Sequence, residues 1–249
     1  MPRRPRIQLN NAPLHIVQRG HNREACFLGI EDYQSYLYGL QEALQNHDCK
    51  LHAYALMTNH VHLLLTPKKA DLVPRLVQSI GRRYVQHINR TNHRTGTLWD
   101  SRYKSLVVHA DSYLLACQRY IELNPVRAPM VNDPAHYRWS SYRHHALGRP
   151  DPRITPHPLY ASIASTTSTT STDKARQTAY RALFRTALDD DAIDDIRLAL
   201  NQNQPLENNR FHGQIEKKLG DRREARPRGR PRLAETASEV QPRQRRLAL

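Results

Sequence analysis

Cysteine is scarce in this sequence, and long hydrophobic runs are missing. The only three cysteines among the 249 residues are Cys26, Cys49 and Cys117, which are far apart and form no CxxC pair. This pattern argues against a disulfide framework and against a zinc site built from cysteines. No apolar run approaches membrane-spanning length, and no secretion-signal core follows the basic residues 1–6. We therefore expect a cytoplasmic protein with no membrane partner.

Acidic residues are too few to balance the basic ones. The chain has 38 Lys and Arg against 23 Asp and Glu, which gives a formal net charge of +15. Such a chain associates with polyanions through counterion release, so an ordinary small-molecule enzyme is disfavoured. Charge alone does not separate DNA, RNA and an acidic protein as partners. Much of the excess positive charge lies in the Arg/Pro-rich residues 222–246, so the net charge says little about the folded part of the chain.

Hydrophobic periodicity predicts an α+β fold. Alternating and continuous apolar runs indicate strands, and apolar residues three or four apart indicate helices. The resulting order is β-α-β-β-α-β-α, which is typical of a ferredoxin-like antiparallel sheet with packed helices. The predicted strands are 13–19, 51–57, 61–66 and 105–109, and the predicted helices are 31–46, 71–89 and 111–123.

The composition changes after about residue 150. We expect a folded domain at 1–150, followed by a linker at 151–172 that ends in a Ser/Thr-rich stretch. Short helical patterns then predict a small helical module at 173–221. The Arg/Pro-rich residues 222–249 have the composition of a disordered tail that is attracted to phosphates. The predicted fold is thus a ferredoxin-like domain with a helical extension and a basic tail.

A pair of histidines, His60 and His62, opens the third predicted strand. Residues i and i+2 of a strand project from the same face, so both imidazoles can bind one divalent ion. The alternative is two ordinary strand histidines, because a chain with 14 histidines is expected to contain about one HxH triplet by chance.

Tyr120 and Asn124 are four residues apart near the end of the last predicted helix, and they share one helical face if the helix reaches that far. A tyrosine hydroxyl can act as a nucleophile, and an amide oxygen can complete the coordination of a metal. The alternative is that Tyr120 packs the helix on the sheet and Asn124 ends the helix before Pro125.

Several basic residues alternate with aromatic ones and suit a track that binds DNA phosphates beside stacking platforms. A solvated charged face is an equally good interpretation of any one of them. These candidate DNA-binding residues are Arg19, Arg82, Arg83, Arg102, Lys104, Arg119 and Arg127.

Three motifs resemble one family. They are MTNHVHLL at 57–64, GTLWDSRYKS at 96–105 and RYIELNPVRA at 119–128. In this order and spacing they are similar to the REP-associated tyrosine transposases, IS200-like members of the single-tyrosine branch of the HUH (His-hydrophobic-His) endonucleases. The resemblance covers about residues 13–142. It departs from the family at Thr58, where Pro is common, and it does not cover the chain after residue 150.

The resemblance implies a fold, a reaction and a partner. The HUH endonuclease fold is ferredoxin-like, and the transposase catalytic domain is expected at 1–150. By this resemblance Tyr120 is the catalytic nucleophile and His60, His62 and Asn124 are metal ligands for Mg²⁺ or Mn²⁺. The tyrosine attacks single-stranded DNA and forms a 5′-phosphotyrosine, and strand transfer reverses that attack. The implied partner is hairpin-forming DNA of the REP type, which would place a monomer or homodimer at the nucleoid.

Two other functions remain open. One is a noncatalytic, sequence-specific DNA-binding regulator derived from a transposase, although a pure binder has no need of the set His60, His62, Tyr120 and Asn124. The other is an RNA-binding module on a ferredoxin-like sheet, which requires exposed aromatic residues in RNP-type motifs. The sequence contains no such motif.

Overall fold

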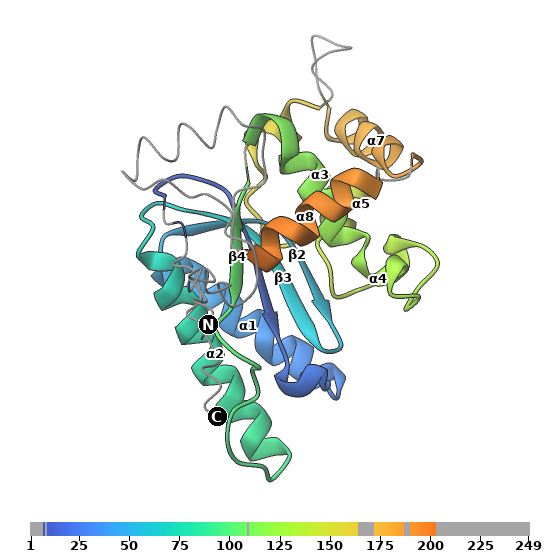
Figure 1. Ribbon diagram of the computed structural model, residues 1–249. Coiled ribbons are helices and arrows are strands. Elements are labelled where there is room, and N and C mark those ends of the chain that lie inside the picture. The colour runs from blue at the N-terminus through green and yellow to red at the C-terminus, as the bar shows by residue number, and fades with distance from the viewer. Residues whose placement is uncertain (1–6, 8, 109, 164–171, 187–189, 203–249) are drawn as a thin grey trace, which may run out of the picture. The chain divides into compact units, whose positions relative to one another are not determined.

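An antiparallel sheet of four strands, in the order β2-β3-β1-β4, organises the computed structural model of this protein (Figure 1). The strands are β1 (Leu14–Arg19), β2 (Cys49–Met57), β3 (His60–Pro67) and β4 (Lys104–Val107). The structure describes residues 7, 9–108, 110–163, 172–186 and 190–202, all within the compact unit Met1–His212.

The hairpin β2–β3 brings the histidine pair to the middle of the sheet. Thr58 and Asn59 form the two-residue connection that the sequence predicts, and Met57 pairs with His60 across it. His62 lies opposite Ala55 on β2 and opposite Val17 on β1. Because β3 is an inner strand, both neighbours fix its register and the direction of its side chains.

Two long helices, α1 (Ile30–Asn46) and α2 (Leu72–Thr91), pack together and cover one face of the sheet. Asp32, in the first turn of α1, caps the start of the helix by accepting hydrogen bonds from the backbone N–H groups of Leu28 and Gly29. Gly81 of α2 lies close to the side chain of Gln18 on β1. The two helices therefore cover the sheet face that carries the even-numbered residues of β1.

The opposite face of the sheet packs against α3 (Ala110–Glu122). Leu114, Cys117 and Ile121 of this helix join Val17 and Leu64 in a buried hydrophobic cluster. Helix α8 (Asp190–Gln202) completes the cluster with Ile193, Ile196, Ala199 and Leu200. The predicted α+β class and the order β-α-β-β-α-β-α are both confirmed.

Residues 137–141 extend the sheet at the outer edge of β2. Leu56 N–H donates to Trp139 O at 2.9 Å, and Ser141 N–H donates to Tyr54 O at 3.0 Å. A second buried cluster, which contains Tyr142, Ala146, Tyr160 and Tyr180, follows this edge. It is built from the short helices α5 (Tyr142–Leu147) and α6 (Pro158–Ala161) together with α7 (Asp173–Leu183).

Short helices complete the described chain: α4 (Asn124–Arg127) and the 3₁₀ turns η1 (His21–Arg23) and η2 (Pro134–His136). None of the helices in the described ranges has the length and apolar character that crossing a membrane requires. Most of the Ser/Thr-rich stretch, the helical pattern predicted after residue 202 and the basic tail lie outside the described residues. The division into domains at 150, 172 and 221 stays a prediction.

Candidate active site

His60 and His62 lie on the same face of β3, and their ring centroids are 4.9 Å apart. His62 is 3% exposed, whereas His60 is partly open to solvent. His60 Nδ1 lies 2.6 Å from Asn59 Oδ1. An amide oxygen only accepts hydrogen bonds, so Nδ1 of His60 carries the proton and Nε2 carries the lone pair. This nitrogen is therefore available to a ligand.

A third histidine, His15 on β1, completes the cluster. Its Nε2 lies 2.8 Å from His62 Nδ1, and the two rings are stacked with centroids 5.1 Å apart. No sequence motif indicated His15 as a site residue. The position of His15 in the strand could have indicated a functional role. His15 shares the core-facing side of β1 with Val17, and an apolar residue is expected there.

Burial keeps the three imidazoles neutral. Desolvation, helped by the charge of His60, lowers the pKa of His15 to about 3. Desolvation, helped by Arg19, lowers the pKa of His60 to about 4. The pKa of His62 lies well below its ordinary value, because burial is reinforced by neighbouring His60, His15, Arg127 and Arg19. At neutral pH each ring therefore offers one lone pair and one N–H group.

Tyr120 on α3 faces this cluster from above the sheet. Its ring centroid lies 5.9 Å from that of His15 and 6.0 Å from that of His62, and both contacts are edge-on. The guanidinium of Arg127 lies over the tyrosine ring, 4.1 Å from its centroid, and Tyr120 is 5% exposed. A tyrosine hydroxyl, neutral imidazoles and a cation thus meet in one place.

Asn124 is connected to Tyr120 through Arg127. Asn124 Oδ1 accepts a hydrogen bond from Arg127 Nη2 at 3.1 Å, and its Nδ2 donates to Ile121 O at 3.4 Å. The other guanidinium nitrogens of Arg127, Nε and Nη1, are buried and have no hydrogen-bond partner among the described residues. Buried cationic N–H groups of this kind suit an oxygen of a bound phosphate.

The donors of the histidine pair fit a divalent cation. His62 Nε2 is buried without a partner in the described structure, while its Nδ1 is fixed by His15. Ligating histidines in proteins usually have their second nitrogen held in this way. No group of three or more His, Cys, Asp and Glu side chains in the described ranges is arranged to hold a metal. A further ligand would have to be of another kind, such as the amide oxygen of Asn124, which accepts a hydrogen bond from Arg127 Nη2.

The predicted DNA-binding residues do not form one surface. Arg19 is exposed at the end of β1, opposite His60 in the strand register, and Arg102 is exposed in the loop before β4. Arg82 and Arg83 belong to α2, on the face that carries Gln18 rather than His15, and Arg83 forms an ion pair with Glu42. Their roles in DNA binding stay predictions.

Two other predicted DNA-binding residues contact the later part of the chain. Arg119 Nη2 donates to Thr186 O at 2.6 Å, and its guanidinium lies 5.8 Å from the ring centroid of Phe184. Lys104 Nζ donates to Asn201 Oδ1 at 2.8 Å. Of the predicted basic residues, Arg127 is the one that contacts the ring of Tyr120.

One known family matches the part of the chain that carries these residues. Residues 8–124 match the family model described as "Transposase IS200 like", a segment that contains His15, His60, His62 and Tyr120 and ends at Asn124. This segment, a little under half of the chain, is similar to the IS200-like transposases. The match supports a transposase, an enzyme that cuts and joins DNA.

One solved structure agrees with the fold, and a second shows a weaker similarity. The first is a REP-associated tyrosine transposase bound to a REP hairpin, which is 15% identical with a TM-score of 0.53; the match covers 63% of this chain and 93% of that one. A candidate transposase from Deinococcus radiodurans R1 is 22% identical, with coverages of 49% and 96%; its TM-score of 0.34 is too low to support an argument. The search of curated proteins gives no significant match.

Proposed function

We propose that this transposase nicks and rejoins single-stranded, hairpin-forming DNA of the REP type, with Tyr120 as the nucleophile. The observation that carries the proposal is the position of Tyr120, whose ring makes edge-on contacts with His15 and His62 and has the guanidinium of Arg127 over it. A packing tyrosine requires neither a cation with unpaired N–H groups nor a cluster of neutral imidazoles beside it.

In the proposed reaction, Tyr120 Oη attacks the phosphorus of a phosphodiester. The bond between Oη and phosphorus forms while the bond between phosphorus and the 3′-oxygen breaks. The phenol loses one proton and the departing 3′-oxygen gains one, so the products are a 5′-phosphotyrosine and a free 3′-hydroxyl. Joining is the reverse attack by a 3′-hydroxyl on the phosphotyrosine.

Arg127 is placed to stabilise the charge that develops on the phosphate. Its Nε and Nη1 can donate to a non-bridging oxygen while Nη2 remains bonded to Asn124. His60, His62 and Asn124 would hold Mg²⁺ or Mn²⁺, and the bound ion would supply further polarisation of the phosphate. The lowered pKa values of the histidines support metal binding, because only a neutral imidazole is a ligand.

Hairpin DNA is the proposed substrate for two reasons. The structural relative with the same fold is bound to a REP hairpin. The net charge of +15 also favours a polyanionic partner, and Arg19 and Arg102 are exposed for contact with phosphates.

The test is covalent capture of DNA. Labelled single-stranded hairpins from the flanks of the gene are incubated with the protein and Mg²⁺ or Mn²⁺, and a denaturant-stable adduct is scored. We expect an adduct with the wild type and none with Tyr120→Phe, which retains hairpin binding. Tyr113→Phe is the matched control, since it removes another hydroxyl from α3. Full adduct formation by Tyr120→Phe contradicts the assignment of the nucleophile, and hairpin binding without any adduct supports the noncatalytic regulator.

A further inference from the structure

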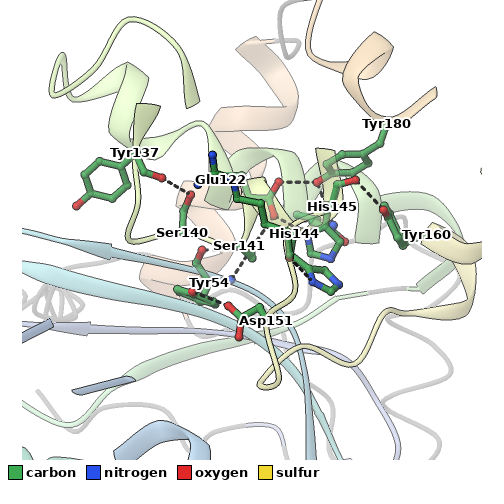
Figure 2. Close-up of polar contacts among 12 residues, drawn as sticks. Tyr54, Glu122, Tyr137, Ser140, Ser141, His144, His145, Asp151, Tyr160 and Tyr180 are labelled. Atoms are coloured by element: carbon green, nitrogen blue, oxygen red, sulfur yellow. Dashed lines mark hydrogen bonds and ion pairs between the residues drawn. The ribbon is translucent and has the colours of Figure 1, made fainter. Parts of the chain in front are cut away.

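Glu122 is a fully buried carboxylate on α3, two residues after Tyr120 (Figure 2). Its Oε1 accepts a hydrogen bond from Ser141 Oγ at 2.6 Å and another from His145 Nδ1 at 2.8 Å. Its Oε2 accepts a hydrogen bond from Tyr180 Oη at 2.7 Å. The carboxylate therefore gathers three donors, two from the start and interior of α5 (Tyr142–Leu147) and one from α7.

The Ser141 contact connects this carboxylate to the sheet. Ser141 Oγ also accepts a hydrogen bond from Tyr54 N–H at 3.0 Å, and Ser141 N–H donates to Tyr54 O at the same distance. The residue after Tyr54 is Ala55, which pairs with His62 in the strand register. A short path of hydrogen bonds thus runs from the helix of Tyr120 to β2, the strand that pairs with the strand of the two histidines.

All three donors belong to the chain beyond the family match, and two of them lie in helices α5 and α7. His145 belongs to α5, and Tyr160 Oη donates to its backbone oxygen at 2.7 Å. Tyr180 belongs to α7, and it accepts a further hydrogen bond from Gln118 Nε2 at 2.9 Å. Both helices follow residue 124, where the family model ends. The contacts hold the C-terminal end of α3 against α5 and α7.

The cluster has the residue types of a hydrolase triad but not its geometry. Ser141 and His145 both donate to Glu122, whereas a triad needs the serine hydroxyl to donate to the histidine. The side chains of Glu122 and His145 are also closed to solvent. The cluster is therefore unsuited to a second hydrolytic site and suited to holding α3 in place.

We propose that Glu122 is a positioning residue that sets the place of Tyr120 relative to His60 and His62. Successive helix residues turn by about 100°, so the side chains of Glu122 and Tyr120 leave α3 in nearly opposite directions. The side of α3 that carries Glu122 anchors the helix, and the side that carries Tyr120 presents the tyrosine hydroxyl. The group must be a carboxylate, because all its partners donate and an amide would turn an NH₂ group toward one of them. The inference rests on the proposed role of Tyr120.

The test compares Glu122→Gln with Asp151→Asn. Asp151 is also a carboxylate that accepts a hydrogen bond from a tyrosine, Tyr54 Oη at 2.8 Å, but its other partner is Arg153 rather than a residue of α3. Both variants exchange a carboxylate for an amide beside β2. The measurements are the single-turnover rate of adduct formation at saturating hairpin, the hairpin Kd and the melting temperature, at a temperature where each protein is folded.

We expect Glu122→Gln to slow adduct formation by about 10- to 100-fold, the range that a displacement of about 1 Å causes, and to leave the hairpin Kd within about twofold. Asp151→Asn lowers the melting temperature but keeps the wild-type rate. A folded Glu122→Gln protein with the wild-type rate overturns the inference, and so does an equal loss of rate in both variants. Absence of an adduct in the wild type overturns instead the proposed function on which the inference rests.

Two smaller changes keep the inference testable if Glu122→Gln does not fold. Ser141→Ala breaks the path to β2, and Tyr180→Phe removes one hydroxyl from the clamp of α7. Each is expected to slow adduct formation without weakening hairpin binding, and Tyr180→Phe also speeds amide hydrogen exchange in residues 173–183. Wild-type rates in both variants contradict the positioning role.

Discussion

Nε2 of His15 and Nδ1 of His62 lie 2.8 Å apart, so one of these two neutral rings donates a hydrogen bond to the other. The direction of this bond decides what His62 offers to a ligand. If Nδ1 of His62 donates, its Nε2 has a lone pair that can bind a metal; if Nδ1 accepts, Nε2 carries a proton. His15 thereby controls which tautomer of His62 is present.

Replacement of His15 by Phe removes this hydrogen bond but keeps an aromatic ring in the stack. We expect binding of Mn²⁺ to weaken by about 10- to 100-fold, the usual effect of losing the hydrogen-bond partner of a metal-ligating histidine. The measurement is the Kd for Mn²⁺ from the electron paramagnetic resonance signal of the free ion. His15→Gln, which restores an amide near the position of Nε2, is expected to recover part of the affinity. Equal affinities in wild type and His15→Phe contradict the role of His15.

Adduct formation is expected to need the guanidinium group of Arg127 and not only its positive charge. Lysine keeps the charge but loses Nε and the flat group that lies over Tyr120. We therefore expect Arg127→Lys to slow adduct formation by about 100-fold, as loss of a preorganised donor to a developing negative charge does. Arg119→Lys on α3 is the control, because its guanidinium contacts Thr186 and Phe184. Similar losses in both variants would show that Arg127 has no special place in the reaction.

The parts of the fold that depend on local pattern were predictable from the sequence. The alternation of side chains in a strand was enough to place His60 and His62 on one face of β3. Helical spacing, with Pro125 as a limit, was enough to end α3 near Tyr120, and the helix ends at Glu122. These features involve residues within a few positions of one another, where backbone geometry fixes the outcome.

The contacts across the sheet were not predictable in the same way. The meeting of His15 and His62 depends on the register between β1 and β3, across 47 positions of the chain. Glu122 finds its partners 19, 23 and 58 positions away. Arg119 fitted a phosphate-binding pattern by its charge, although its partner Thr186 lies 67 positions later. Tertiary packing decides such contacts, and spacing in the sequence does not encode them.

Acid is expected to destabilise the protein partly through His52 on β2. Its Nδ1 hydrogen-bonds Thr155 O at 2.7 Å and its Nε2 hydrogen-bonds Thr66 Oγ1 at 2.8 Å, an arrangement that uses the neutral ring. Burial lowers the pKa of His52 from 6.5 to about 4, so the unfolded chain binds this proton more readily than the folded one. The contribution of His52 to the free energy of unfolding is therefore fully present above pH 6.5. It is lost as the pH falls toward 4, by about 1.4 kcal/mol per pH unit.

Urea unfolding of the wild type and of His52→Asn between pH 8 and pH 4 measures this contribution. Asparagine can still donate to Thr155 but does not titrate. The difference between the two proteins above pH 7 gives the constant cost of losing the ring. Below pH 6.5 the wild type is expected to lose stability more steeply than the variant. Parallel curves over the whole range contradict a lowered pKa for His52.

Helix α8 is expected to stabilise the fold of the transposase domain even though it follows the residues that match the family. Ile196 is fully buried in the cluster that contains Tyr120, whereas Leu198 on the same helix is 56% exposed. Deleting most of a buried aliphatic side chain loses its transfer free energy and leaves a cavity, so Ile196→Ala should lower the free energy of unfolding by about 2–4 kcal/mol. Leu198→Ala is the matched control and should cost less than about 0.5 kcal/mol. Chemical denaturation measures both values, and a cost for Ile196→Ala as small as that of the control would mean that α8 does not pack on α3 and the sheet in solution.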